Sequence, residues 1–147
     1  YLAPHDYHRL HMPLDASLKR MIHVPGRLFS VAEWTVQEIP RLFARNERLA
    51  CYFETAFGPM VMVLVGAINV SAIETVWTGA VVPPRARKIS EYDYRHTTKE
   101  IRKGAEMGRF NMGSTVILLT ANKVDWLPDF VAGHKVKMGQ PIGQFPA

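Results

Sequence analysis

The feature that most constrains the fold is a series of short apolar runs that proline and glycine interrupt before any could form a long helix. They are residues 47–55 (ERLACYFET), 59–67 (PMVMVLVGA), 72–77 (AIETVW), 114–120 (STVILLT) and 134–138 (HKVKM). They are rich in β-branched and aromatic residues and either alternate with a two-residue period or stay apolar throughout, which is typical of strands. The sequence therefore predicts a mainly β protein.

One stretch, 30–46 (SVAEWTVQEIPRLFARN), could form helical turns, but Pro40 interrupts it. We therefore expect an all-β protein with short helical segments.

A short pattern occurs twice. Gly104, Gly108 and Phe110 recur with the same spacing as Gly139, Gly143 and Phe145. Two copies are too few for a repeat array. We expect two similar strand corners, in which glycine permits the bend and phenylalanine fills the core.

Length and composition favour one globular domain over 1–147. The chain is 48% hydrophobic and 21% charged, as in ordinary soluble domains. The single cysteine, Cys51, excludes an intrachain disulfide and alternates with apolar Leu49 and Phe53. We expect a core thiol in a reducing compartment.

The net charge of +5 is spread along the chain, and its densest group is 83–88 (PPRARK), for which we expect a solvated loop. No recognition-helix, zinc-finger or aromatic–basic RNA pattern accompanies it, so nucleic-acid binding is not predicted. The longest apolar run, 60–70, has eleven residues. A membrane-spanning helix needs about 20. Any action at a membrane is therefore expected from the protein surface.

The candidate chemistry lies in two places. Gly113 and Ser114 lead directly into an apolar strand in 110–119 (FNMGSTVILL), whereas glycine in a strand usually marks a bulge or a close backbone approach. Near the N-terminus, His8 and His11 stand three residues apart in YLAPHDYHRLHMP. Taken singly, each feature fits an ordinary structural role.

Two catalytic alternatives have weaker support. His5, Asp6, His8 and His11 could ligate a metal, but no glutamate lies between the histidines as in HExxH. A serine hydrolase would need the second glycine of G-x-S-x-G, which GSTV lacks.

Four stretches occur in an order that resembles a known family. They are YLAPHDYHRLHMP, LFARNERL, VGAINVSAIETVW and KGAEMGRFNMGSTVILL. Together they resemble the membrane-associated phosphatidylserine decarboxylases of bacteria and mitochondria, from Tyr1 to about Leu119. The family pattern at the cleavage point is Leu-Gly-Ser-Thr, and Met112 replaces the leucine, apolar for apolar.

The resemblance implies that the chain cuts itself between Gly113 and Ser114. The products would be 1–113 (the beta chain) and 114–147 (the alpha chain), and Ser114 would become a pyruvoyl cofactor that forms a Schiff base with substrate. By position in the family's YHxxH pattern, His11 would be the base for self-cleavage and His8 the acid or base used in decarboxylation.

The resemblance also implies features outside the catalytic pair. The family's processing aspartate precedes Tyr1, and Asp6 does not match it, so we expect a missing N-terminal segment. Arg9 is a candidate for substrate contact only because it lies near the histidines. The implied fold is a mixed, mostly antiparallel β-sandwich with short helical segments, related to the carrier-type hybrid folds.

The implied activity is a carboxy-lyase that converts phosphatidylserine to phosphatidylethanolamine and CO2. The two chains would stay associated, and a homo-oligomer is expected. The enzyme would be peripheral on a membrane, on the cytoplasmic face of the bacterial inner membrane or, alternatively, at the mitochondrial inner membrane.

A non-enzymatic alternative remains open at this point. The glycine corners and the ending VKMGQPIG also resemble lipoyl and biotinyl carrier domains, whose modified lysine commonly lies between two methionines. Here Lys137 is flanked by Val136 and Met138, and the histidines have no role in that interpretation.

Overall fold

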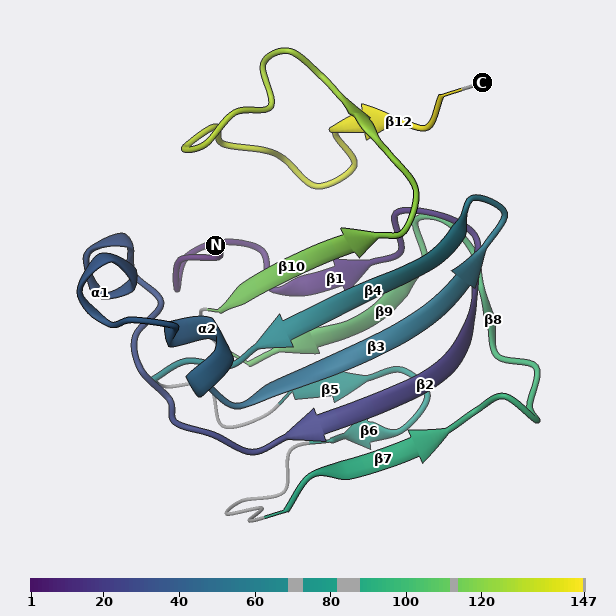
Figure 1. Cartoon of the computed structure of the whole chain (residues 1–147), viewed down its shortest axis with the longest axis horizontal. Coiled ribbons are helices and arrows are strands. Elements are labelled where there is room, and N and C mark those ends of the chain that lie inside the picture. The colour runs from purple at the N-terminus through teal and green to yellow at the C-terminus, as the bar shows by residue number, and fades with distance from the viewer. Residues whose placement is uncertain (69–72, 82–87, 112–113, 147) are drawn as a thin grey trace.

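The computed structural model describes residues 1–68, 73–81, 88–111 and 114–146, and it shows two large β-sheets facing each other (Figure 1). The front sheet contains six strands, in the order β10-β4-β3-β2-β7 with β8 also paired to β2. Their bounds are β2 (Ala16–Val24), β3 (Arg48–Thr55), β4 (Gly58–Val65), β7 (Ser90–Asp93), β8 (Glu100–Ile101) and β10 (Thr115–Thr120).

The second sheet and a small third one complete the strands. The four-stranded sheet has the order β1-β9-β5-β6, and β11 pairs with β12. Their bounds are β1 (Arg9–His11), β5 (Ile73–Thr75), β6 (Gly79–Ala80), β9 (Glu106–Phe110), β11 (Asp125–Trp126) and β12 (Gly143–Gln144). All these strand pairs are antiparallel, so the predicted mainly β, antiparallel sandwich is confirmed.

The core lies between the two sheets, where the inward positions of each strand alternate with outward ones. In β3, Leu49, Cys51 and Phe53 are buried, and they belong to the same apolar cluster as Ile73 of β5 and Met107 of β9. Burial raises the pKa of the Cys51 thiol far above its ordinary value, because the thiolate would lose its hydration. The prediction of a core thiol is confirmed.

The strand predictions succeed where the sequence is continuously apolar. The runs at 47–55, 59–67 and 114–120 form β3, β4 and β10, and the described part of 72–77 contains β5. The prediction of a strand at 134–138 is wrong, because this segment lies in the connection between β11 and β12. Within the described ranges it pairs with no strand, and Val136 and Met138 are exposed.

The short helices match the prediction and its break at Pro40. Helix α1 (Glu33–Glu38) and helix α2 (Leu42–Arg45) lie on either side of that proline. Ile39 already has an extended backbone, as expected for a residue that precedes proline.

The prediction of two similar strand corners with a core phenylalanine is confirmed for the first copy and wrong for the second. Gly104 and Gly139 both adopt positive φ, whereas a Cβ on Gly108 would come within 2.4 Å of the Glu74 backbone oxygen. Phe110 is buried in the core. Phe145 is only half-buried and stacks on Phe57 at 4.4 Å, because its strand belongs to the small third sheet.

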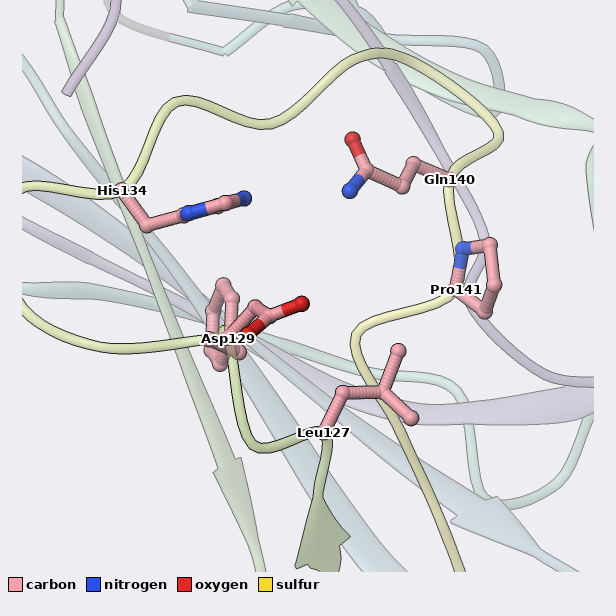
Figure 2. A pocket seen from close by; sticks show the side chains of 6 residues that line it. Leu127, Asp129, His134, Gln140 and Pro141 are labelled. Atoms are coloured by element: carbon pink, nitrogen blue, oxygen red, sulfur yellow. The ribbon is translucent and has the colours of Figure 1, made fainter.

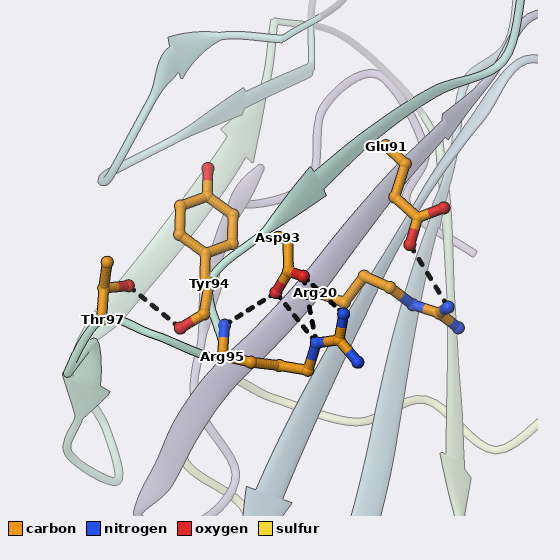
Figure 3. A network of polar contacts seen from close by, with 6 residues as sticks. All are labelled: Arg20, Glu91, Asp93, Tyr94, Arg95 and Thr97. Carbon is orange, nitrogen blue, oxygen red and sulfur yellow. Dashed lines mark hydrogen bonds and ion pairs between the residues drawn. The ribbon is translucent and has the colours of Figure 1, made fainter.

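The edge of the front sheet carries a network of polar contacts around β7 (Figure 3). Arg20 of β2 pairs with Glu91 at 3.3 Å, and its guanidinium lies 4.4 Å from the Tyr52 ring centroid. Hydrogen bonds from Arg95 hold the pKa of the Asp93 carboxyl well below its usual range. Charged groups on an edge strand discourage pairing with another chain.

Two further statements concern the surface. The loop predicted at 83–88 falls almost wholly outside the described residues. Within the ranges that the structure describes, no helix combines the length and apolar character needed to cross a membrane.

The burial of Cys51 generates a prediction about its reactivity. In the native chain at pH 8, the thiol should react with a disulfide reagent at least about 100-fold more slowly than in urea-unfolded chain, since only opening of the sandwich exposes it. Absorbance at the wavelength of the released thiolate measures both rates. Equal rates in the two states would contradict a sealed core.

Candidate active site

Ser114 is held by backbone hydrogen bonds at the start of β10. Its N–H donates to the Leu2 carbonyl at 3.0 Å, and its carbonyl accepts from the Leu2 N–H at 2.8 Å. The side chain is fully buried, and Oγ has no hydrogen-bond partner among the described residues. A buried hydroxyl without a partner is costly, and Thr35, Thr75 and Thr115 also carry one, so Ser114 is distinguished by its place next to Gly113 at the predicted cleavage point. Gly113, the other half of the predicted cleavage point, lies outside the described residues.

The segment before β1 links Ser114 to the histidines. At one end Leu2 pairs with Ser114, and at the other the Phe110 N–H donates to the His8 carbonyl at 3.0 Å. Phe110 ends β9, which pairs with β1. The N-terminal segment is therefore fastened to both chain segments that flank the predicted cleavage point.

His8 has one nitrogen available for proton transfer. Nδ1 lies 2.5 Å from the carbonyl oxygen of Asp6, which can only accept, so Nδ1 carries the hydrogen. In the neutral ring, Nε2 then holds a lone pair. Nε2 is buried and has no partner among the described residues. His8 thus presents an unengaged basic nitrogen inside the protein.

His11 has both nitrogens engaged. Nδ1 lies 2.7 Å from the Gly104 carbonyl and therefore donates to it, so Nε2 accepts from the Tyr7 hydroxyl at 2.8 Å. The Tyr7 and His11 rings also stack, with centroids 5.7 Å apart. His11 pairs with Glu106 at the start of β9, whereas His8 lies opposite the end of that strand.

Arg9 lies between the histidines in sequence, but its charge is already paired. Its guanidinium donates to Glu106 at 2.7 Å, and this hydrogen bond raises the pKa of Arg9. Arg109 pairs in the same way with Glu74. These two ion pairs border a hollow of about 220 Å³ that is lined by Glu74, Thr75, Val76, Gly79, Glu106, Gly108 and Arg109.

The LFARNERL stretch supplies a buried amide that fixes the backbone beside Ser114. The Asn46 side chain donates to the carbonyls of Phe29 (2.8 Å) and Gly66 (2.9 Å), and it accepts from the Phe29 N–H (3.0 Å). Thr115 pairs with Val65, so the next position along each strand places Gly66 beside Ser114. Asn46 therefore holds the strand end against which Ser114 lies.

A buried histidine–glutamate pair lies at the same end of the sandwich as Ser114, and it was not predicted from the sequence. His23 Nε2 lies 2.8 Å from Glu47 Oε1, and its Nδ1 is buried without a partner among the described residues. The Gly66 N–H donates to the Glu47 carbonyl at 2.8 Å. The sequence signal for this pair was that His23 occupies an alternating position within 16–24. That segment was not predicted to be a strand.

The metal-site alternative shares His8 and His11 with the candidate site and adds His5 and Asp6, whereas the carrier alternative depends on Lys137. His5 and Asp6 are exposed and 3.7 Å apart, and no three potential metal-binding side chains cluster among the described residues. Lys137 is exposed between β11 and β12, where its N–H donates to the Gln140 side chain.

A second hollow, of about 120 Å³, lies in the C-terminal segment (Figure 2). His134 and Gln140 face each other across it, above Asp129 and Leu127. Its lining residues do not include Ser114, His8 or His11. The buried polar atoms at the start of β10 therefore remain the better candidate site.

The fold and site define an antiparallel β-sandwich with a buried serine and a histidine-bearing segment joined at one end. The family model described as phosphatidylserine decarboxylase matches residues 1–144. The phosphatidylserine decarboxylase proenzyme of Methylococcus capsulatus is 56% identical over 144 residues, covering 97% of this chain and 50% of that protein.

Two further relatives carry the same name. The proenzyme of Azotobacter vinelandii is 53% identical over 148 residues (98% of this chain, 51% of that protein). That of Xylella fastidiosa is 54% identical over 143 residues (97% and 49%). The chain belongs to the phosphatidylserine decarboxylase family, and it spans about half the length of the curated relatives it matches.

The role of Asn46 can be tested by stability. Asn46→Ala should lower the free energy of unfolding by about 3 kcal/mol, because two carbonyls and one N–H would lose a buried partner. Urea denaturation followed by circular dichroism measures the change. The matched control is Asn122→Ala, an exposed asparagine with one bond to the Phe57 carbonyl, which should cost less than about 1 kcal/mol. Equal losses in the two variants would contradict the assigned role.

Proposed function

We propose that the protein decarboxylates phosphatidylserine to phosphatidylethanolamine and CO2 after cutting itself between Gly113 and Ser114. The observation that carries the proposal is the buried, unpartnered Ser114 hydroxyl at the start of β10, in a chain that belongs to this family. The names of the relatives, which specify proenzymes, support a chain that matures by cleavage.

Self-cleavage uses the chain's own atoms. Ser114 Oγ attacks the Gly113 carbonyl carbon while a base takes the hydroxyl proton, and the amide becomes an ester as the proton passes to the Ser114 nitrogen. Elimination then removes a proton from Ser114 Cα and breaks the Cβ–O bond, releasing Gly113 as a carboxylate. Water replaces the nitrogen of the resulting dehydroalanine, which leaves as ammonia.

The pyruvoyl group that results supplies an electrophilic carbonyl, which binds the substrate amine and accepts the electrons left by departing CO2. Ser114 fits this group, because its carbonyl accepts a hydrogen bond from the Leu2 N–H that conversion would leave in place, and its side chain has no competing hydrogen bond among the described residues. The neighbouring strand β10 restrains the residue on its C-terminal side.

We assign the two histidines to different proton transfers. His8 returns a proton to the substrate carbon during decarboxylation, and its unengaged, buried Nε2 supports this role. His11 takes the Ser114 proton during self-cleavage. For that step the Tyr7 hydroxyl must release His11 Nε2, which it occupies in the present structure.

The two pieces are expected to stay together after cleavage. β10 pairs with β4 along its whole length, from Thr115–Val65 to Thr120–Met60, and Ser114 pairs with Leu2. We further propose that the protein is a homo-oligomer and peripheral on a membrane. The cytoplasmic face of the bacterial inner membrane is the first choice of location, and the mitochondrial inner membrane is the alternative.

Replacement of Ser114 tests the cleavage. Ser114→Ala should remain a single chain on denaturing gels, because alanine supplies no nucleophile, whereas the parent protein should resolve into two pieces. Ser114→Thr, which keeps a hydroxyl, is the matched control and should cut at a reduced rate. Normal cleavage of Ser114→Ala would refute the proposal, and a mass addition on Lys137 in an uncut parent would support the carrier alternative.

Separate replacement of the histidines tests their roles. His8→Ala should still yield 1–113 and 114–147 but decarboxylate phosphatidylserine roughly 100- to 10,000-fold more slowly, since it lacks a general acid. His11→Ala should accumulate uncut chain.

Denaturing gels run beside a CO2-release assay measure both effects, and His134→Ala serves as a histidine control remote from Ser114 in the fold. If His11→Ala matures normally while His8→Ala stays uncut, the two roles are exchanged. If both variants mature and both turn over normally, neither histidine is catalytic.

A further inference from the structure

The buried pair of His23 and Glu47 has no part in the proton transfers assigned above. The His23 side chain is 1% exposed and that of Glu47 is 14% exposed, and His23 Nε2 lies 2.8 Å from Glu47 Oε1. Because a carboxylate oxygen only accepts, Nε2 carries the hydrogen. Apolar side chains of similar volume often stabilise a core at least as well as a buried polar pair. The pair therefore points to a role other than stability alone.

Backbone hydrogen bonds connect Glu47 to the residue beside Ser114. The Glu47 carbonyl accepts from the Gly66 N–H at 2.8 Å, and the Glu47 N–H donates to the Arg27 carbonyl at 2.8 Å. With the bond from His23, Glu47 is held at its side chain and at both backbone groups. Because Val65 pairs with Arg48 on one side and with Thr115 on the other, the next row across the strands is Glu47, Gly66 and Ser114.

Ser114 meets Gly66 through packing rather than through backbone hydrogen bonds. The Ser114 N–H and carbonyl both bond to Leu2, so they point away from β4, and the hydrogen on Ser114 Cα faces Gly66. Antiparallel residues opposed in this way form the closely spaced pairs, about 4.5 Å apart between Cα atoms. A Cβ on Gly66 would lie 3.3 Å from the Glu47 carbonyl oxygen, so this row has little spare room. The position of Gly66 therefore sets the position of Ser114 on this side.

The pair is too far from Ser114 to exchange a proton with it directly. Glu47 and Ser114 lie on opposite sides of Gly66, about 10 Å apart between Cα atoms when one wide and one narrow strand pairing are added. Glu47 Oε1 is bonded to His23 of β2, and β2 lies on the side of β3 away from β4 and β10 (Figure 1). The pair can act on Ser114 only through the strand end that it holds.

We propose that His23 and Glu47 are positioning residues for self-cleavage, because their hydrogen bond fixes the strand end that aligns Ser114 Oγ with the carbonyl it attacks. The inference rests on the proposed function and deepens it. A misplacement of about 1 Å can cost about 100-fold in rate. The attacked Gly113 carbonyl is no longer attached to residue 114 after maturation, so the pair should matter for the cut and little for later turnover.

Substitutions that remove or keep the hydrogen bond test the pair in full-length protein. Glu47→Leu and His23→Leu remove it, and each should slow the appearance of the 114–147 piece by roughly tenfold or more. Glu47→Gln keeps an acceptor and His23→Gln keeps a donor, so each should cut within about threefold of the parent rate. The double leucine variant should be no slower than the slower single variant, since the two residues act as one unit. Denaturing gels of freshly synthesised protein, sampled over time, measure the rates.

Two further readings separate positioning from a general loss of structure. Matured protein of each leucine variant should release CO2 from phosphatidylserine within about threefold of the parent rate per pyruvoyl group, counted by reaction with hydroxylamine. The matched control is Glu91→Leu, which removes a carboxylate at the far edge of the same sheet, where Glu91 pairs with Arg20 at 3.3 Å. This control should cut at the parent rate.

Gly66→Ala tests the same strand end without removing the pair, and it decides the question if the leucine variants do not fold. The added Cβ would press on the Glu47 carbonyl oxygen, so the cut should slow by roughly fivefold or more. Turnover per pyruvoyl group should again stay close to that of the parent.

Parent-rate cutting by folded Glu47→Leu or His23→Leu would overturn the inference, and so would parent-rate cutting by Gly66→Ala. Equal losses of cutting and of turnover per pyruvoyl group would assign the pair to general stability and also overturn it. A parent protein that never cuts would refute the proposed function and this inference together. A parent that cuts normally beside variants that cut equally fast would refute the inference alone.

Discussion

The paired backbone hydrogen bonds between Leu2 and Ser114 are the constraint on which the site depends. They attach the N-terminal segment to the start of β10, an edge strand. The pairing of β1 with β9 anchors the other end of this segment, which carries His8. Ser114 is consequently restrained by Leu2 on one side and by the β4 strand end on the other. A backbone held on both sides can carry a buried hydroxyl with no partner among the described residues. After loss of the Ser114 nitrogen as ammonia, the hydrogen bond from the Leu2 N–H to the carbonyl of residue 114 would remain.

Buried polar groups contribute to the end of the sandwich around Ser114. Asn46 satisfies the backbone at Phe29 and Gly66, and the His23–Glu47 hydrogen bond lies beside it. Buried polar groups stabilise the fold only when their hydrogen-bond partners are correctly placed, so they favour a single arrangement of the strand ends.

The fold could be predicted where local pattern and tertiary environment agree. β3, β4 and β10 are nearly continuous apolar runs, whereas β2, which pairs with β3, β7 and β8, was missed because Lys19 and Arg20 interrupt its pattern at a register shift. Segment 134–138 has strand-like alternation but no partner strand among the described residues, so propensity alone gave the wrong result there. The roles predicted for Ser114, His8 and His11 came from the family resemblance, which rests on the order of the four motifs. His23 and Glu47 act together only through strand register, which one sequence without a structure does not reveal.

The central claim is that Ser114 becomes a carbonyl-bearing N-terminus. The most direct measurement is the mass of the 114–147 piece, isolated under denaturing conditions from protein that releases CO2 from phosphatidylserine. The account predicts a piece lighter by one ammonia than the same peptide with an N-terminal serine, and a further mass increase after hydroxylamine treatment. A fully active preparation containing only the intact chain, or a piece with an unmodified N-terminal serine, would contradict it.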